Sequence, residues 1–156
     1  MIRNFSLDEF AASATAAERR INNAVPEELE PQAWSTLQMM QAIRDHLSAV
    51  AGRDVPISIT SGYRSPALNA AVKGSATSDH VRAMAVDFKA PRFGTTTQVV
   101  RELSRHVDAL GIGQLILEYP ERGSGSWVHV STRKPAKQLN RVITITASGT
   151  FVGVRG

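Results

Sequence analysis

The chain contains no cysteine. This absence excludes disulfide bonds and thiolate ligands, so any metal ion in this protein must be held by His, Asp or Glu. Aromatic residues are also few, with two Trp, two Tyr and five Phe among 156 residues. A stacking platform for single-stranded nucleic acid needs several aromatic rings, and we do not expect one here. No stretch approaches the roughly 20 consecutive apolar residues of a membrane span, so no membrane insertion is expected.

The composition is that of one soluble globular domain. Apolar residues make up 42% of the chain and charged residues 21%, which is typical of folded domains. We expect a single domain over residues 1–156 and a monomer. The first ten residues contain no apolar segment of signal-peptide length, which predicts that the chain is not exported by its own leader.

Positive charges outnumber negative ones. The formal net charge is +4 and the isoelectric point is near 10. Such a surface favours an anionic partner, for example nucleic acid, acidic lipid or an anionic cell-wall polymer, although solubility alone also explains it. The positive residues are scattered, and no recognised nucleic-acid-binding motif accompanies them. We therefore expect no nucleic-acid partner.

Two long helices are predicted from apolar residues that recur every three or four positions. The first covers residues 31–50 and ends at Gly52, and the second covers residues 95–110. Two short helices are also expected: one starts at the capping box Ser6–Glu9, and the other covers residues 66–72. The apolar stripes of the long helices consist of Trp34, Leu37, Met40, Ile43, Leu47 and Val50, and of Val99, Val100, Leu103, Val107 and Leu110.

Short alternating segments predict strands. They cover residues 56–60, 83–89, 114–119, 127–131, 142–146 and 150–154. The last two surround Ala-Ser-Gly and are typical of a hairpin. Together with the helices, this pattern predicts an α+β fold, with an antiparallel sheet of about four to six strands and helices packed on one side.

Two histidines and one aspartate are the most informative residues. His80 and Asp87 share one short segment, and His129 is central in the strand 127–131. Three such ligands leave one zinc position for water, and a nearby carboxylate can accept that water's proton. If strands 114–119 and 127–131 pair, Glu118 lies opposite or diagonal to His129, within about 5–8 Å. The spacing favours a hydrolytic metal site. It also leaves open that each histidine is an ordinary half-buried residue.

The two carboxylates allow another interpretation, because Asp87 and Glu118 are also compatible with the carboxylate pair of a glycosidase. The other two histidines, His46 and His106, fall on the two long helices, where histidines are commonly structural or solvated, and we leave them outside the site. The H-E-x-x-H signature of many zinc peptidases is absent.

Four separated segments resemble, in order, the D-alanyl-D-alanine carboxypeptidase / L-alanyl-D-glutamate endopeptidase family of zinc peptidases. They are SGYRSP with the following Leu68 and Asn69, SDH ending at His80, AVD ending at Asp87, and WVHVS around His129. The N-terminal segment is similar to that of phage-encoded and prophage-encoded members. The likeness runs from about residue 5 to residue 132, which leaves the hairpin region 142–156 outside it.

One position departs from the family pattern S-x-H-x-x-G-x-A-x-D. Ala83 occupies the place of the glycine. If the backbone there needs a positive φ, alanine is strained.

The resemblance implies a Hedgehog-like zinc peptidase that cleaves amide bonds in the peptide stems of bacterial peptidoglycan, of D,D-carboxypeptidase or L-Ala-D-Glu endopeptidase type. It implies that His80, Asp87 and His129 hold Zn²⁺ and that Glu118 is the general base. Glu121, in the following loop, is a second candidate for the base.

The resemblance also implies roles around the metal. Arg64 would bind a substrate carboxylate or stabilise the developing oxyanion, while Ser78 and Trp127 would lie beside the substrate. An alternative is a non-catalytic cell-wall-binding or virion module that retains the fold. The phage-type likeness places the protein in the host cytoplasm before lysis or on a virion, acting on the cell wall.

Overall fold

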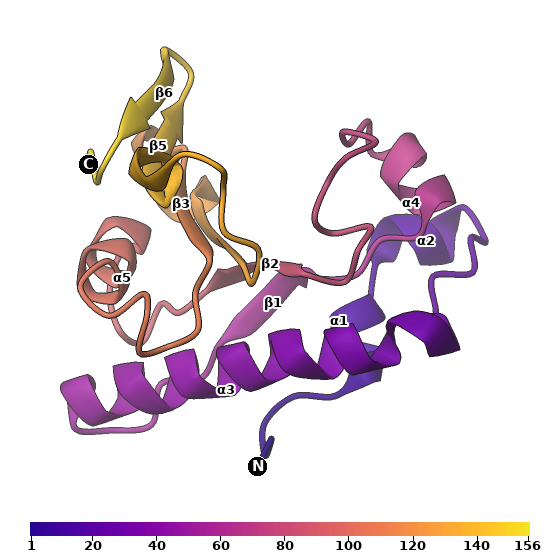
Figure 1. Ribbon diagram of the computed structural model, residues 1–156, viewed down its shortest axis with the longest axis horizontal. Helices are drawn as coiled ribbons and strands as arrows, with labels where there is room; N and C mark the ends of the chain where they lie inside the picture. The colour runs from indigo at the N-terminus through magenta and orange to yellow at the C-terminus, as the bar shows by residue number, and fades with distance from the viewer.

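A computed structural model describes residues 1–156 and has the α+β architecture that the sequence predicts (Figure 1). Six strands form one sheet in the order β1-β2-β4-β3-β5-β6. Their bounds are β1 Ser58–Ser61, β2 Ala85–Lys89, β3 Gln114–Glu118, β4 Trp127–Ser131, β5 Val142–Thr146 and β6 Gly149–Val152.

Five α-helices and three 3-10 turns complete the fold. The α-helices are α1 Leu7–Ala11, α2 Ala14–Glu18, α3 Glu30–Ala51, α4 Pro66–Ala71 and α5 Thr96–Leu103, and the turns are η1 Glu27–Leu29, η2 Pro120–Gly125 and η3 Gln138–Asn140. The expected first helix is divided, because Ser13 caps α2 by accepting a hydrogen bond from the backbone of Ala16. None of the helices combines the length and apolar character needed to cross a membrane.

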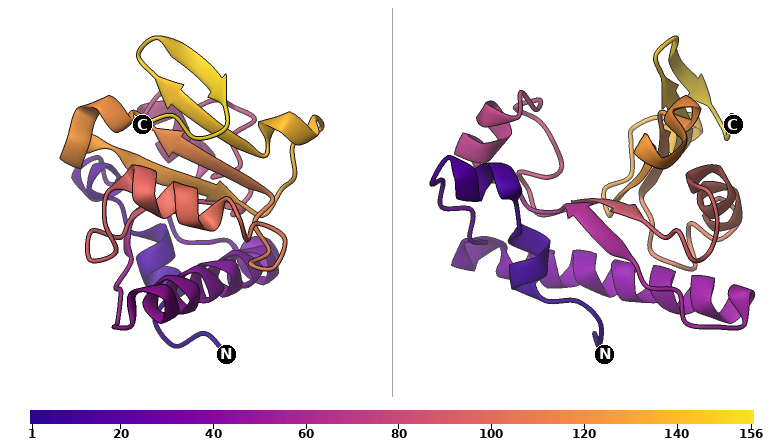
Figure 2. Two further views of the ribbon diagram at one scale, coloured as in Figure 1. Left: turned by 90° about the vertical axis from the view of Figure 1, so that its left-hand side faces the viewer. Right: turned by 180° about the vertical axis from the view of Figure 1, so that it is seen from behind.

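The sheet is antiparallel except for one pair. Strand β5 pairs parallel to β3, whereas the sequence favoured an antiparallel sheet throughout. The connection after β4 passes over the end of the sheet, so the C-terminal hairpin β5–β6 extends the sheet beyond β3 (Figure 2). Arg141 fixes this crossover: its guanidinium donates hydrogen bonds to the carbonyl oxygens of Gly113 and Ile112 and to Asp108.

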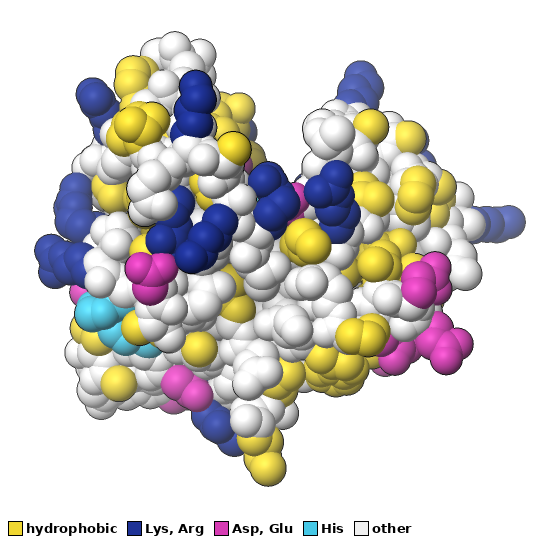
Figure 3. All heavy atoms as spheres, in the orientation of Figure 1, with side chains coloured by type: hydrophobic (Ala, Val, Ile, Leu, Met, Phe, Trp, Pro, Cys, Tyr) yellow, Lys and Arg dark blue, Asp and Glu magenta, His cyan; other side chains and the backbone are white.

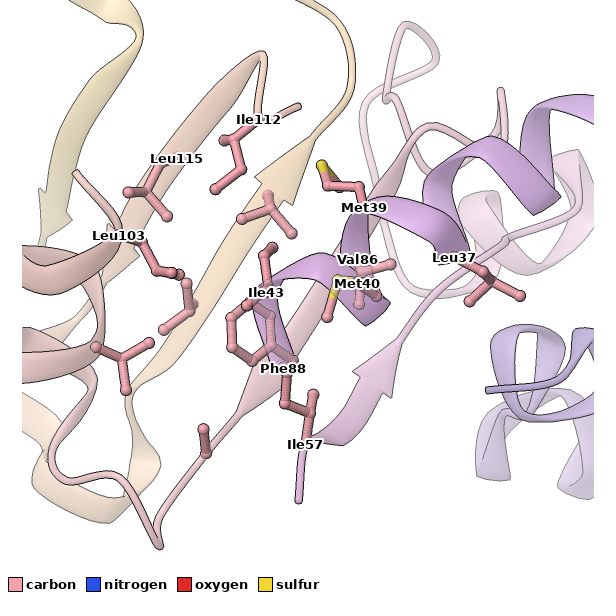
Figure 4. Packing of buried hydrophobic residues seen from close by; sticks show 14 of the residues in the cluster. Leu37, Met39, Met40, Ile43, Ile57, Val86, Phe88, Leu103, Ile112 and Leu115 are labelled. Atoms are coloured by element: carbon pink, nitrogen blue, oxygen red, sulfur yellow. The ribbon is translucent and has the colours of Figure 1, made fainter. Parts of the chain in front are cut away.

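Helices α3 and α5 cover the same face of the sheet. Their apolar stripes meet the alternate side chains of β2, β3 and β4 in one core, part of which Figure 4 shows close by. The fully buried members include Leu37, Met40, Ile43, Leu47, Phe88, Leu103, Leu115, Leu117, Val128 and Val130. Because strand side chains alternate between faces, the residues between these core positions point to the other face.

The apolar stripe of α3 predicts that Trp34 and Val50, at its two ends, lie in the core, and this prediction is wrong. Trp34 and Val50 are exposed, because the sheet does not reach both ends of the 22-residue helix α3. Helix α5 is also shorter than predicted. After Leu103 the backbone amides of Arg105 and His106 turn back to carbonyls three residues earlier, which tightens the chain into turns. Val107 and Leu110 still pack against the core from these turns.

Strand β2 begins two residues later than predicted, and Ala83 explains the difference. Its φ is 58°, in the left-handed region, which a strand cannot continue through. The side chain is completely buried, and the carbonyl oxygen accepts a hydrogen bond from the Thr36 hydroxyl of α3. The backbone at this position therefore adopts a positive φ, and it is the position at which the family pattern that the sequence resembles has glycine.

Candidate active site

Asp87 and His129 meet on the face of the sheet that α3 and α5 leave uncovered. Strands β2 and β4 pair so that the two residues are direct cross-strand partners. His129 Nδ1 lies 2.8 Å from Asp87 Oδ1. The alternation of β2 and β4 thus sends Val86, Phe88, Val128 and Val130 into the core and this pair outward.

His80 reaches the same point from the turn before β2. Its Nδ1 lies 2.7 Å from the carbonyl oxygen of Gly62, and its Nε2 lies 3.3 Å from Asp87 Oδ2. A carbonyl oxygen can only accept, so Nδ1 carries a proton. In a neutral imidazole, Nε2 then presents its lone pair to the carboxylate. Two lone-pair atoms at this distance need a proton or a cation between them.

We call His80, Asp87 and His129 the groove cluster. Their ligand atoms all lie within 4.8 Å of one another. Zinc bonds of about 2.0–2.2 Å place two ligands of a tetrahedral ion roughly 3.3–3.6 Å apart, so small side-chain movements suffice to enclose an ion. The Gly62 carbonyl orients one imidazole from behind, as carbonyls commonly do for metal-binding histidines. The residues therefore fit a zinc ion.

The charge state of Asp87 also suits a cation. Burial by itself would raise the pKa of this carboxyl group, but the hydrogen bonds and positive charge of His129 and His80 outweigh that effect and hold the pKa well below its usual range. Arg64 adds positive charge, with Nη2 3.9 Å from Asp87 Oδ2. Asp87 is therefore a carboxylate at neutral pH, as a metal ligand must be.

Glu118 stands beside the groove cluster at the end of β3. In the β3–β4 pairing His129 faces Ile116 and Glu118 faces Trp127, so Glu118 is diagonal to His129 on the same face. Burial raises the pKa of Glu118, the charges of His129 and Arg122 lower it, and that of Asp87 raises it, with a net upward shift. A raised carboxyl pKa suits a group that must accept and release a proton near neutral pH.

Glu121, the other candidate base, is placed differently. It lies in the 3-10 turn η2, its side chain is exposed, and it does not line the groove described below. Of the two glutamates, only Glu118 lines the groove that runs over the cluster.

Arg64 is held in the loop between β1 and α4. Its Nε donates to the Ser61 hydroxyl and its Nη1 to the Asn69 side chain. A Cβ at Gly74 would collide with the Asn69 side chain, so glycine at this position leaves room for the hydrogen bond between Asn69 and Arg64. The arginine thus has a structural role, and its remaining N–H groups are available to the groove.

Ser78 and Trp127 lie on the rim. The Ser78 hydroxyl accepts a hydrogen bond from the backbone N–H of His80, which shapes the turn that carries this histidine. The Trp127 ring packs against Tyr119, with ring centroids 5.4 Å apart. Both residues line the groove.

Sequence reasoning missed a polar support beneath His80. Asp79 is buried and accepts hydrogen bonds from the Ser131 hydroxyl and from Arg133 Nε. These bonds lower its pKa against the opposing effect of burial. They tie the turn before β2 to the end of β4. The one available signal was the position of Asp79 directly before His80.

A groove of about 770 Å³ runs over the cluster. Its walls include Lys73 and Ser75 on the α4 side, and Tyr119, Arg133 and Ile145 on the other. Figure 3 shows Lys and Arg side chains on both sides of the hollow between α4 and the C-terminal hairpin. The hairpin contributes Ile145 to the wall, although the resemblance noted above ends before it. An open, positively lined groove over a candidate metal site suits an extended anionic substrate.

Comparison with known proteins agrees with this geometry. A search of curated proteins found no match. A family model described as Peptidase M15 matches residues 3–131, which include every residue of the groove cluster and Glu118. That range spans most of the chain and both strands that meet at the site. The chain therefore belongs to the Peptidase M15 family of zinc-dependent metallopeptidases.

Proposed function

We propose that this protein is a zinc peptidase that hydrolyses amide bonds in the peptide stems of peptidoglycan. Family membership implies a metallopeptidase that acts on such peptides. The observation that supports the specific assignment is the convergence of His80, Asp87 and His129 on the floor of an open groove with Glu118 on its wall.

The role proposed for each residue follows from the position of its side chain. His80, Asp87 and His129 would hold the zinc ion, and a bound ion would supply a Lewis acid for the scissile carbonyl and for water. Glu118 accepts the proton of the attacking water and returns it to the leaving amine. Its half-buried position beside His129 keeps the proton near the reacting atoms.

Arg64 is assigned to the substrate. It is the one Lys or Arg side chain with a nitrogen within 4.0 Å of the Asp87 carboxylate, at 3.9 Å, and two of its N–H groups already donate to Ser61 and Asn69. A fixed guanidinium pairs with a carboxylate at low entropic cost. Stem peptides carry carboxylates, so Arg64 together with Lys73 and Arg133 accounts for the positive lining of the groove. Trp127 and Ser78 complete the rim.

The experiment is hydrolysis of purified peptidoglycan by zinc-loaded protein, with release of free amines as the readout. We expect new amines from wild type and a rate of release lower by about 10²–10⁴-fold from Glu118→Gln, while Glu121→Gln serves as the matched control on the exposed neighbour. Loss of activity in both variants would remove the assignment of the base. New reducing ends in place of amines would indicate a glycosidase that uses Asp87 and Glu118.

A non-catalytic cell-wall-binding or virion module remains the second candidate, and Ala83 motivates it. An alanine with φ of 58° between two proposed ligands is a departure at a sensitive point. That candidate predicts sedimentation with peptidoglycan and no released product from zinc-replete protein. The same pair of measurements therefore separates the two functions.

A further inference from the structure

A second group of metal-ligating side chains lies away from the groove. His46 projects from α3, Glu102 from α5, and His106 from the turns that follow α5. We call these three residues the helix cluster. Their ligand atoms lie within 4.8 Å of one another, as those of the groove cluster do. Nothing in the proposed hydrolysis uses them.

The two imidazoles point at one carboxylate oxygen. His46 Nε2 lies 2.9 Å and His106 Nε2 3.4 Å from the same Glu102 Oε1. The ring centroids are 4.5 Å apart and the rings are tilted by 51°. The His106 distance falls within the roughly 3.3–3.6 Å between two ligands of a tetrahedral zinc ion, and the His46 distance is that of a hydrogen bond, which a small side-chain movement would open to the same range.

The charge on Glu102 lacks a permanent counterion. The side chain is only 18% exposed, and its ion-pair partners are the two histidines alone. Arg101 and Arg105 border the same hollow as Glu102 but make no ion pair with it, and Arg101 donates to the carbonyl oxygen of Gly156 instead. A half-buried carboxylate with no Lys or Arg in an ion pair is stabilised by a cation held between it and the imidazoles.

We propose that His46, Glu102 and His106 form a second binding site for a divalent transition-metal ion such as zinc, one that joins α3 to α5. Two imidazoles and one carboxylate are ligands that zinc accepts. The His106 side chain is 41% exposed, so an ion can enter from solvent. Figure 3 shows histidine side chains at the surface where α5 lies over α3.

The site is structural in character. It bridges residues 56 positions apart in the chain, and it does not border the groove that holds Glu118. An ion that binds the folded protein and not the unfolded chain raises the stability of the fold. The proposal therefore predicts a zinc-dependent gain in stability that persists when the groove cluster is disabled.

The test counts zinc ions in metal-free protein by calorimetric titration with zinc chloride. We expect two equivalents for wild type, one for His129→Ala and none for His129→Ala combined with His106→Gln. Arg105→Gln in the His129→Ala background is the matched control, since it changes an exposed neighbour, and it should keep one equivalent. His46→Gln in place of His106→Gln gives an independent second variant.

Thermal unfolding provides the second readout. At zinc concentrations about a hundredfold above the measured Kd, the melting temperature of His129→Ala should rise by about 5–10 °C, and that of the double variant should not change. Equal zinc binding by His129→Ala and by the double variant would overturn the proposal. Failure of the groove assignment gives a different result: wild type and His129→Ala would then bind the same number of ions.

Discussion

The molecule contains two clusters of two histidines and one carboxylate, and their surroundings differ. The groove cluster is built on paired strands, with His80 buried and oriented by the Gly62 carbonyl. The helix cluster joins side chains from two helical segments, lies nearer the surface and has no carbonyl behind its imidazoles. Similar side chains thus occur in a more buried setting on paired strands beside a groove and in a more exposed setting between helical segments.

The comparison shows that a ligand set does not define a chemistry. What distinguishes the groove cluster is a carboxylate that is not a ligand, Glu118, and an open wall that can accept a substrate. The helix cluster contains a single carboxylate, which is itself a candidate ligand, and the hollow beside Glu102 has only about 180 Å³. A bound ion would serve catalysis in the first and stability in the second.

Removal of the metal should have the largest effect on activity. We expect a chelator to abolish hydrolysis, because the groove cluster would lose the ion that activates water, and added zinc to restore it. In His129→Ala, zinc should fail to restore hydrolysis and still raise the melting temperature through the helix cluster. Amine release measures the catalytic effect, and thermal unfolding of the same samples measures the effect on stability. Hydrolysis that survives chelation would contradict the assignment of the groove cluster.

Loss of the general base should be nearly as severe. Glu118→Gln preserves size and removes the proton acceptor, so we expect the rate of amine release to fall by about 10²–10⁴-fold. Zinc binding at both clusters should remain, as titration would show. Glu121→Gln should retain the wild-type rate, because Glu121 is exposed outside the groove. A Glu118→Gln enzyme with more than a tenth of the wild-type rate would exclude this residue as the base.

The support beneath the groove cluster should contribute to stability. Asp79→Ala removes the buried acceptor of Ser131 and Arg133. A hydrogen bond to a charged group contributes about 1.5–3 kcal/mol. The bond from Arg133 contributes less than this, because the Arg133 side chain is half-exposed. We expect the free energy of unfolding in urea to fall by about 1–3 kcal/mol. Asp108→Ala is the matched control, since its one side-chain hydrogen bond, from Arg141, is accepted by an exposed carboxylate, and it should cost less.

Much of the sheet could be predicted from residue periodicity. The alternation in residues 114–119 and 127–131 predicted the β3–β4 hairpin and a position for Glu118 opposite or diagonal to His129, and the register confirms the pairing and shows the diagonal position. The family resemblance supplied the groove residues, and the structure brings them together. The strand features depend on local pattern, whereas the groove residues lie in separated segments that the resemblance alone connected.

The parts that could not be predicted depend on contacts between distant segments. The parallel pairing of β5 with β3 relies on Arg141 and the carbonyls of residues 112 and 113, and no local pattern encodes it. The exposed end of α3 at Trp34 reflects where the sheet stops. The sequence could not predict that His46 and His106 lie beside Glu102, because these residues come together only when α3 and α5 pack on the same face of the sheet.

Substitution of Ala83 by glycine should have the smallest effect on stability. The position is informative because Ala83 lies between His80 and Asp87 of the groove cluster in the sequence. Ala83→Gly relieves about 1–2 kcal/mol of left-handed strain and loses a buried methyl group worth about 0.8 kcal/mol. Because these terms oppose one another, we expect the free energy of unfolding to change by less than about 1 kcal/mol. Ala83→Val should instead destabilise the protein clearly, since a branched side chain fits neither the positive φ nor the filled core. Urea denaturation of both variants checks this, and a Gly variant that is much less stable than wild type would mean that the methyl packing outweighs the backbone strain.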